Sequence, residues 1–403
     1  MATDKKKIFN IASDLVFSIA GLMLMNGMLQ VLINPMLNKW MGEDAFGNYQ
    51  SIFAVVSIMG TTFGVAANYS RMVRAREKKD TNGDYNVFLT VISVLCIAVA
   101  AGTLVVYQSF SIIHFLLLTV LMIATVFRYY GDVNYRLKLN YKGFFVYYAI
   151  ITAGYCLGLL VYKFVSPLWM LTFIAGEVAA ILFVLFNGNI FKGKDLMKRS
   201  PEFPGTMKSV GVLSATNLLS AIAQQSDKIV LGLAMGGEEV TTFYVATLLG
   251  KVISLLTTPL NGVLIGYLTK YEGKFTKKMF AVFVVALLGI GIVALGGCYI
   301  ASEIFVKIFY PDVFGEAEQY FLVANAGQIF YFISNCLMTV ILRVATEKHQ
   351  MYINIIYIVI YAATVIPLTM TCGIWGMAIA LLITNGLKFA ITSVVGFMKT
   401  NKQ

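Results

Sequence analysis

Charged residues are scarce in this chain, and their scarcity excludes a soluble globular protein. Only 13% of the 403 residues are Asp, Glu, Lys or Arg, whereas 59% are hydrophobic. The mean hydropathy is +0.78. Soluble domains carry about a quarter charged residues, so the composition predicts a chain that lies mostly within a membrane.

Residues for metal binding and covalent catalysis are also few. The two histidines, His114 and His349, lie in separate halves of the chain, so no Ser-His-Asp arrangement can be assembled. The five cysteines form no C-x-x-C pair. Residues 188–195 resemble a phosphate-binding loop but lack its final Ser or Thr and follow an apolar stretch instead of a strand. We therefore expect no metal, no cofactor and no enzymatic activity.

The sequence divides into about twelve apolar stretches of roughly twenty residues, the length that crosses a bilayer core. This pattern predicts an all-α polytopic membrane protein. The first stretch is too long for a signal peptide and has no small-residue cleavage site. The predicted spans are 8–33, 46–68, 87–106, 112–126, 144–161, 168–186, 210–235, 243–268, 280–298, 320–342, 352–370 and 374–397.

Lysine and arginine are distributed unevenly between the predicted loops. Most of the 31 basic residues fall on the side that holds the N-terminus, whereas the other loops hold only Lys39, Lys163 and Lys307. The positive-inside rule then places both termini in the cytoplasm. The net charge of +11 is explained by this topology and by anionic membrane lipids, and we expect no nucleic-acid partner.

One basic, proline-containing segment divides the chain almost in half. It predicts an N-terminal lobe over 1–191, a cytoplasmic linker over 192–205 and a C-terminal lobe over 206–403. The Met-Gly pair at residues 41–42 recurs at residues 235–236, and an acidic pair follows soon after each of them. We interpret this as a parallel pseudo-repeat, with two lobes of about six helices each around a central cavity.

Ionisable residues within the predicted spans are functional candidates, since each costs at least ~2.5–3.5 kcal/mol at the bilayer centre. Glu177 and Lys251 lie at similar depths near the midplane, where they either form an ion pair or face a common cavity. We expect Lys388 to extend its ammonium to the cytoplasmic surface. The remaining candidates are Asp14, Asp227 and Lys228.

Uncharged polar residues concentrate in the first, seventh and eighth spans, which predicts that these spans line a polar cavity. Asn26 and Gln30 share a helix face, and Gln224 and Asn261 lie in the other two spans. Helix–helix hydrogen bonding is the alternative explanation for each of them.

At the inner end of the second span, Arg71 and Arg74 lie three residues apart and point to the same side of a helix. Together they are expected to hold a phosphate group in forked geometry. Ordinary positive-inside anchoring is the alternative.

Two regions resemble a known family. Residues 40–49 and 67–76 resemble the opening of bacterial polysaccharide flippases of the Wzx type. Residues 225–228, Leu231-Gly232 and 240–244 are similar to the matching pattern in the seventh and eighth spans. These flippases share a superfamily with MATE exporters and the lipid II flippase MurJ. MurJ-like proteins carry several arginines in their first spans, whereas the first predicted span of this chain has no arginine. A lipid II flippase is therefore less favoured.

This resemblance implies a transporter in the bacterial cytoplasmic membrane. It would flip a polyprenyl-pyrophosphate-linked oligosaccharide by alternating access, with membrane lipids, H+ or Na+, and glycan polymerase machinery as partners. Arg71, Arg74, Lys228 and Lys251 would meet the pyrophosphate. The sugar hydroxyls would meet Asn26, Gln30, Gln224 and Asn261.

Two alternatives remain open. A MATE-like, cation-coupled small-molecule exporter would use the acidic residues Asp14, Glu177 and Asp227. A membrane enzyme of glycan metabolism is disfavoured, because the chain has no large outside loop and no usable histidines.

Overall fold

The computed structural model describes residues 16–75, 81–192, 196–257, 260, 261, 264, 276–345 and 347–400, and over these ranges it contains helices, turns and no strand. Nine helical segments of this described part are long and apolar enough to cross a membrane. The prediction of an all-α polytopic membrane protein is confirmed. Asp14 lies outside the described residues.

Every predicted span overlaps a helix, although fewer segments qualify as spans by length and composition. One reason is α16 (Glu347–Lys399), which carries two predicted spans and is interrupted at Gly373, where φ is +60° and ψ is −135°. The other is that amide and charged residues in α10 (Phe203–Ala234) lower its hydropathy, and α11 (Gly237–Leu255) contains three charged residues.

The chain folds into two compact units. The N-terminal unit comprises Met1–Gly42 and Asn48–Ile229, and the C-terminal unit comprises Glu43–Gly47 and Val230–Gln403. Most of α10 therefore belongs to the N-terminal unit. The predicted division into lobes at residues 192–205 stays a prediction.

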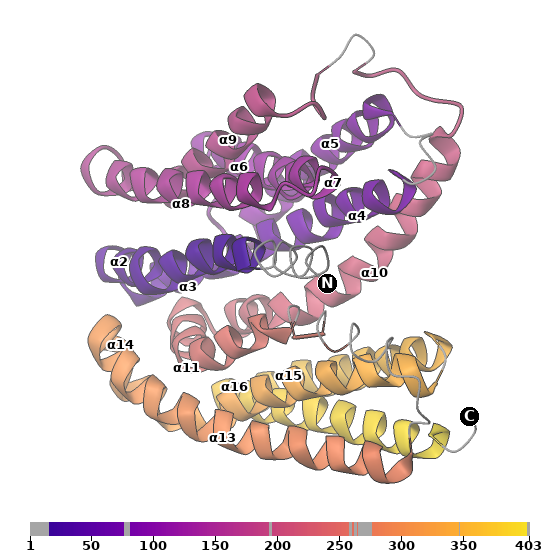
Figure 1. Ribbon diagram of the computed structural model, residues 1–403. Coiled ribbons are helices and arrows are strands. Elements are labelled where there is room, and N and C mark those ends of the chain that lie inside the picture. The colour runs from indigo at the N-terminus through magenta and orange to yellow at the C-terminus, as the bar shows by residue number, and fades with distance from the viewer. Residues whose placement is uncertain are drawn as a thin grey trace, which may run out of the picture. The chain divides into compact units, whose positions relative to one another are not determined.

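The N-terminal unit is a bundle of helices in which α9 lies against both α6 and α8 (Figure 1). Side chains at helix starts fix some of its boundaries: Ser111 accepts a hydrogen bond from the amide of His114 at 3.1 Å, and Asn140 accepts one from Gly143 at 2.9 Å. Its elements are a first helix from residue 16 that includes the π-helical turn η1 (Leu29–Ile33) and ends with α2 (Asn34–Met41), α3 (Glu43–Met59), the π-helical turn η2 (Gly60–Gly64), α4 (Val65–Arg74), α5 (Asn82–Val106), α6 (Ile112–Gly131), α7 (Val133–Leu137), α8 (Tyr141–Phe164), α9 (Trp169–Asn187) and α10.

The C-terminal unit is built around α15 (Phe321–Val344), which packs against α11, α13 and α16 (Figure 1). The long α13 (Lys277–Phe309) is followed by the short α14 (Pro311–Ala317) and the turn η4 (Glu318–Tyr320). Buried Phe332, Leu337 and Phe389 form part of the core between these helices.

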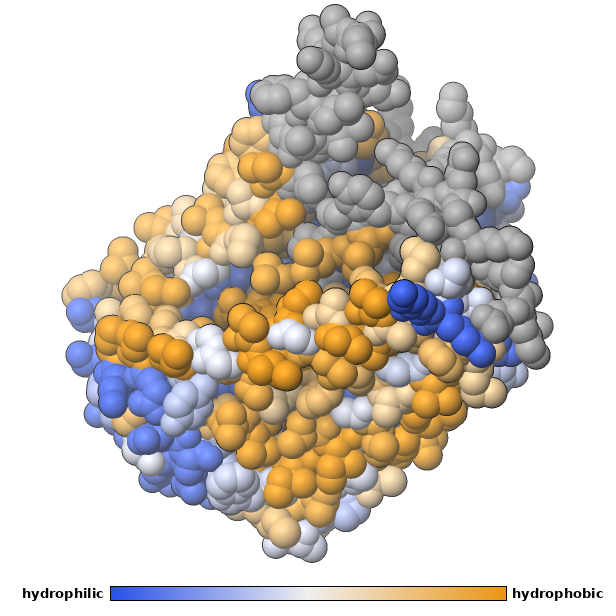
Figure 2. Space-filling view, turned by 60° about the horizontal axis from the view of Figure 1, so that its bottom comes forward, coloured by the Kyte–Doolittle hydropathy of each residue, from blue (hydrophilic) through white to orange (hydrophobic). Residues whose placement is uncertain are grey.

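Large apolar side chains cover much of the molecular surface, as expected where lipid is the solvent. On α13, Ile292 and Val293 are 73% and 77% exposed. Figure 2 shows a broad hydrophobic band on the face drawn, with hydrophilic residues gathered toward its left and right margins.

Two glycine turns support the predicted pseudo-repeat. Gly42 follows α2 with φ +83°, and Gly236 follows α10 with φ +130°. Both values are strained for residues with a Cβ atom, and glycine is the usual choice at helix C-termini. Each turn is followed by a helix with two acidic residues in its first turn, Glu43 and Asp44 in α3, and Glu238 and Glu239 in α11.

The starts of α3 and α11 meet in close backbone contact within the C-terminal unit. The Gly237 amide donates to Asp44 Oδ1 at 3.2 Å, and the Thr241 hydroxyl donates to the Glu43 carbonyl at 2.6 Å. A Cβ atom on Gly47 would overlap the carbonyl oxygen of Gly237. Glycine is therefore required for this approach of the two helices.

Candidate functional site

A buried ion pair joins α6 to α9 in the N-terminal unit. Arg128 donates to Glu177 through Nε at 2.9 Å and Nη2 at 3.3 Å, and the Tyr155 hydroxyl donates to Glu177 at 2.7 Å. The Arg128 guanidinium also stacks on the Tyr129 ring at 3.8 Å from its centroid. Both charged side chains are almost completely buried, so each depends on the other for its charge balance.

A second acidic residue, Asp132, is paired one helical turn further on. Arg136 donates to its two oxygens at 3.0 and 3.2 Å, and Tyr148 donates to it at 3.1 Å. The amide of Asn68 donates to it as well. Thus both of these buried carboxylates are balanced by arginines carried on α6 and α7.

Arg71 lies near the end of α4 and contacts neutral groups. Its guanidinium donates to the Tyr130 hydroxyl and to the side-chain oxygen of Asn82. It also lies over the rings of Tyr85 and Tyr130, at 5.3 and 5.9 Å from their centroids. Among the described residues its partners are neutral, so they orient the arginine without cancelling its charge, and it can attract an anion.

Arg74, one turn away, has a carboxylate partner. Its Nη2 lies 3.5 Å from Glu202 Oε2, and the guanidinium also lies against Gly205 at the start of α10. Arg71 and Arg74 thus have different partners within the protein, and their joint grip on a phosphate stays a prediction.

The predicted residues of α10 have different environments. Lys228 donates to Gln50 Oε1 of α3 at 2.9 Å, and Ser51 donates to the Lys228 carbonyl at 3.0 Å. Asp227 is buried at 3% exposure, whereas Gln224 is exposed. The lysine therefore tethers α10 to α3, and the neighbouring aspartate points to another side of the helix.

On the first helix, the two predicted amides are half-buried and bond locally. Asn26 donates to the carbonyl of Leu22 at 2.9 Å, four residues earlier. Gln30 accepts from Asn34 at 3.5 Å. Asn34 in turn accepts from the hydroxyl of Tyr49 at 3.0 Å, which links this helix to α3.

The C-terminal unit contains a buried lysine in an aromatic setting. Lys388 of α16 is 5% exposed, and its ammonium donates to Asn335 Oδ1 of α15 at 2.9 Å. The rings of Tyr357 and Tyr331 lie 4.6 and 5.2 Å from it. Asn261 donates to the Asn335 carbonyl at 3.3 Å, so this predicted residue joins the cluster. Within the described part of the chain, Lys388 has no carboxylate partner.

The expectation that Lys388 extends to the cytoplasmic surface is wrong. The side chain turns toward Asn335 because a hydrogen bond and two aromatic faces are available within the bundle. Lys251, on α11 of the same unit, is half-buried. Its pairing with Glu177, which belongs to the other unit and contacts Arg128, stays a prediction.

Several residues of these clusters were missed from sequence, and a signal for some of them exists. Arg128, Asp132 and Arg136 are spaced by four residues and follow an apolar stretch, which places alternating charges on one helix face. The fourth span, predicted to end at residue 126, continues as helix to Gly131 and includes Arg128. Asn335 and Tyr357 lie in apolar stretches and give no comparable signal.

Metal ligands are not gathered anywhere in the part of the chain that the structure describes. No group of three or more His, Cys, Asp or Glu residues is close enough to hold a metal ion there. The chemistry of the clusters is instead that of cations, amides and tyrosine hydroxyls, which can form hydrogen bonds to anions and to other polar groups.

Solved structures with a similar fold are transporters and a flippase. An inward-facing multidrug resistance MATE family transporter of the MOP superfamily is 14% identical, with 96% of this chain and 98% of that chain covered and a TM-score of 0.71. The lipid II flippase MurJ in an inward closed conformation is 15% identical, with 96% and 90% covered and a TM-score of 0.73. The Vibrio cholerae MATE transporter VcmN in the bent form is 12% identical, with 98% and 97% covered and a TM-score of 0.60.

No protein-family model matches the sequence, and no curated protein matches it. The likeness therefore rests on three-dimensional structure over nearly the whole length of the chain. The protein has the fold that is found in MATE family transporters and in the MurJ flippase.

Proposed function

We propose that this protein is a transporter, not an enzyme, and that it flips a polyprenyl-pyrophosphate-linked oligosaccharide across the bacterial cytoplasmic membrane. Both termini would lie in the cytoplasm. The proposal is supported by the fold, which also occurs in a lipid II flippase, and by the character of the charges embedded in the helices.

The observation that carries the proposal is the presence of embedded cations with neutral partners. Arg71 is held by Asn82 and two tyrosines, and Lys388 by Asn335 and two tyrosines. By contrast, the buried carboxylate of Glu177 is balanced by Arg128. Positive charge within a span, or at its end, that no described carboxylate balances would attract the anionic group of a substrate during transport.

The remaining predicted residues have roles that follow from their chemistry. Arg74, Lys228 and Lys251 would add positive charge for the pyrophosphate as the substrate passes. The amides that would meet sugar hydroxyls are Asn26, Gln30, Gln224 and Asn261. Lobes over residues 1–191 and 206–403 would alternate in access around a central cavity, leaving the lipid tail in the bilayer.

A MATE-like exporter of small molecules is the second candidate. It is favoured by the fold likeness to MATE transporters and by Asp227, which is buried at 3% exposure in α10. In that case H+ or Na+ coupling would use Asp227, together with Asp14 or Glu177.

The proposed flippase would also use H+ or Na+ coupling. It would have glycan polymerase machinery as a partner.

Lipid extraction from a deletion strain tests the proposal directly. Loss of the gene should cause polyprenyl-linked oligosaccharide to accumulate on the inner leaflet, and the restored gene should clear it. Arg71→Gln and Lys388→Gln should each slow clearance at equal protein level, because each removes a cation that pairs with no carboxylate among the described residues.

Lys163→Gln is the matched control, since it removes a positive charge that stacks on Trp40 in a predicted outside loop. It should clear the lipid like the unaltered protein. An unchanged lipid-linked pool in the deletion strain would reject the flippase. Increased sensitivity to small toxic compounds in the same strain would then support the exporter.

A further inference from the structure

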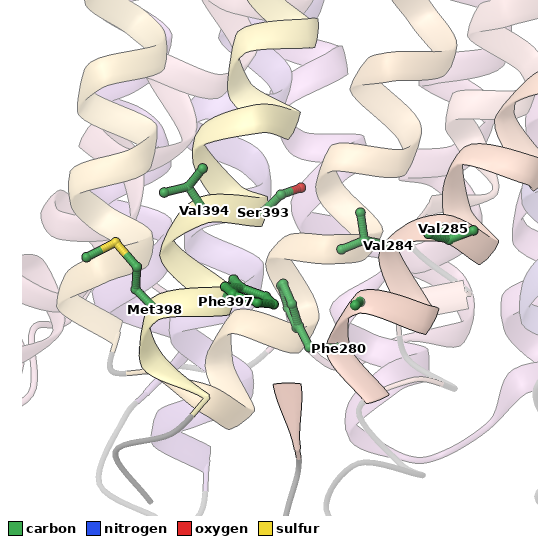
Figure 3. Close-up of a pocket in the computed structure, with 8 residues that line it drawn as sticks. Phe280, Val284, Val285, Ser393, Val394, Phe397 and Met398 are labelled. Atoms are coloured by element: carbon green, nitrogen blue, oxygen red, sulfur yellow. The ribbon is translucent and has the colours of Figure 1, made fainter. Parts of the chain in front are cut away.

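An apolar groove lies between α13 and α16 in the C-terminal unit (Figure 3). It has a volume of about 370 Å³ and is lined by four residues of α13, from Phe280 to Val285, and four of α16, from Ser393 to Met398. It is separate from the Lys388 cluster, and none of the predicted substrate residues lines it.

The floor of the groove is built by a close helix contact. The ring of Phe280, only 1% exposed, lies directly over Gly396, where a Cβ atom would overlap the ring. The glycine lets α16 approach the ring closely, so the floor is closely packed.

The rim of the groove is open and apolar. Val285, Val394 and Met398 are 66%, 58% and 64% exposed, and both helices belong to candidate membrane spans. The hydroxyl of Ser393 donates to the carbonyl of Phe389 at 2.8 Å. Since this hydroxyl is already bonded within its own helix, the lining suits a hydrocarbon chain.

Positive charge gathers at one end of the groove. The Lys277 ammonium lies 5.1 Å from the centroid of Phe397, which is itself a lining residue. Lys278 and Lys399 adjoin this end in sequence, at the start of α13 and the end of α16. The sequence has no acidic residue over 277–302 or 374–399, the stretches of the two helices that carry the lining residues and these lysines.

We propose that this groove binds an anionic phospholipid of the inner leaflet, with one acyl chain in the groove and the phosphate at Lys277 and its neighbouring lysines. The positive charge at the end of the apolar groove favours an anionic lipid over a neutral one. Cation–π contact with Phe397 holds the Lys277 ammonium at the level where a phosphate would lie. The proposal is independent of the substrate that the protein transports.

Native mass spectrometry of the purified full-length protein tests the proposal. The protein is supplied with equimolar phosphatidylglycerol and phosphatidylcholine, and bound lipids are counted. We expect the protein to prefer phosphatidylglycerol. The combined Lys277→Gln, Lys278→Gln and Lys399→Gln variant should lose this preference, because each lost lysine should weaken phosphatidylglycerol binding roughly fivefold. Lys307→Gln, which alters a lysine at the other end of α13, should keep the preference.

A second variant separates the chain from the headgroup. Ala281→Phe fills the groove from an exposed position and should reduce the binding of both lipids, whereas Val293→Phe on the same helix should not. Phosphatidylglycerol binding that survives Ala281→Phe would overturn the proposal, because the headgroup would then adsorb without the groove. Displacement of phosphatidylglycerol by undecaprenyl phosphate from the unaltered protein would also overturn it in favour of a polyprenyl occupant.

Discussion

At the residue scale, two carboxylates buried in the N-terminal unit, Glu177 and Asp132, are each paired with an arginine. Glu177 receives two hydrogen bonds from Arg128 and one from Tyr155, and Asp132 is similarly surrounded by Arg136 and Tyr148. A buried ion pair gives little net stability compared with an apolar pair, but the loss of one partner leaves a charge that nothing balances. The pairs therefore act mainly by fixing how α6 contacts its neighbours.

A double-mutant cycle checks the coupling of Arg128 and Glu177. Glu177→Gln and Arg128→Met should each destabilise the protein by about 3–5 kcal/mol, because each leaves the opposite charge buried. The double variant should be less destabilised than the sum of the two. Thermal unfolding of the detergent-solubilised protein, followed by intrinsic fluorescence, measures the three shifts.

Tyr155→Phe provides the control for this cycle. It removes one hydroxyl donor from Glu177 and keeps the ion pair, so a loss of only about 1 kcal/mol is expected. Additive effects of the Arg128 and Glu177 changes would contradict the coupling.

The partner of Glu177 illustrates what the sequence could and could not predict at this scale. A glutamate within an apolar stretch requires compensation, and this requirement is visible from sequence alone. The identity of the partner depends on the packing of α9 against α6, which hydropathy does not encode. Lys388 is similar: its polar setting arises from Asn335 and Tyr357 on separate helical segments.

At the element scale, existence of the spans was predictable, whereas some of their ends were not. The third span, predicted as 87–106, ends at Val106 in the structure but begins earlier, at Asn82. The carboxylate of Asp84 accepts from the amide of Thr81 at 3.1 Å and from that of Ser200 at 2.7 Å, which stabilises the extra turn. Hydropathy places the end of a span where polar residues begin, but capping extends helices through them.

The contact between the starts of α3 and α11 can be tested by substituting one of its glycines. Gly47→Ala places a methyl group against the Gly237 carbonyl, so the starts of α3 and α11 must separate. We expect a destabilisation of about 1–3 kcal/mol from this overlap. Gly102→Ala is the matched control, because nothing lies within 4 Å of its added Cβ atom.

Gly102→Ala should leave stability unchanged or raise it slightly, since alanine favours helix more than glycine does. The apparent melting temperatures of the two variants in detergent make the comparison. Equal melting temperatures would mean that the contact between Gly47 and Gly237 contributes nothing to the fold.

At the scale of the whole molecule, exposed apolar surface and the distribution of lysine define how the chain lies in a membrane. Residues such as Ile292 and Val293 on α13 are mostly exposed and need lipid around them. By the positive-inside rule, the basic residues at the helix ends predict which side is cytoplasmic. The hydropathy pattern was sufficient to predict the polytopic class, because lipid imposes the same length and polarity on every span. The hydropathy pattern and the distribution of lysine and arginine do not indicate which substrate the protein carries.

The orientation can be tested at the two ends of a single helix, α8. Lys138 precedes it in a predicted inside loop and Val165 follows it in a predicted outside loop, and both side chains are exposed. In a background with the native cysteines replaced by serine, Val165→Cys should react with a membrane-impermeant maleimide in intact cells. Lys138→Cys should react only after permeabilisation, because the bilayer separates the two ends of α8. The reverse pattern would mean that the positive-inside assignment is inverted, and labelling of both in intact cells would show that α8 does not cross the membrane.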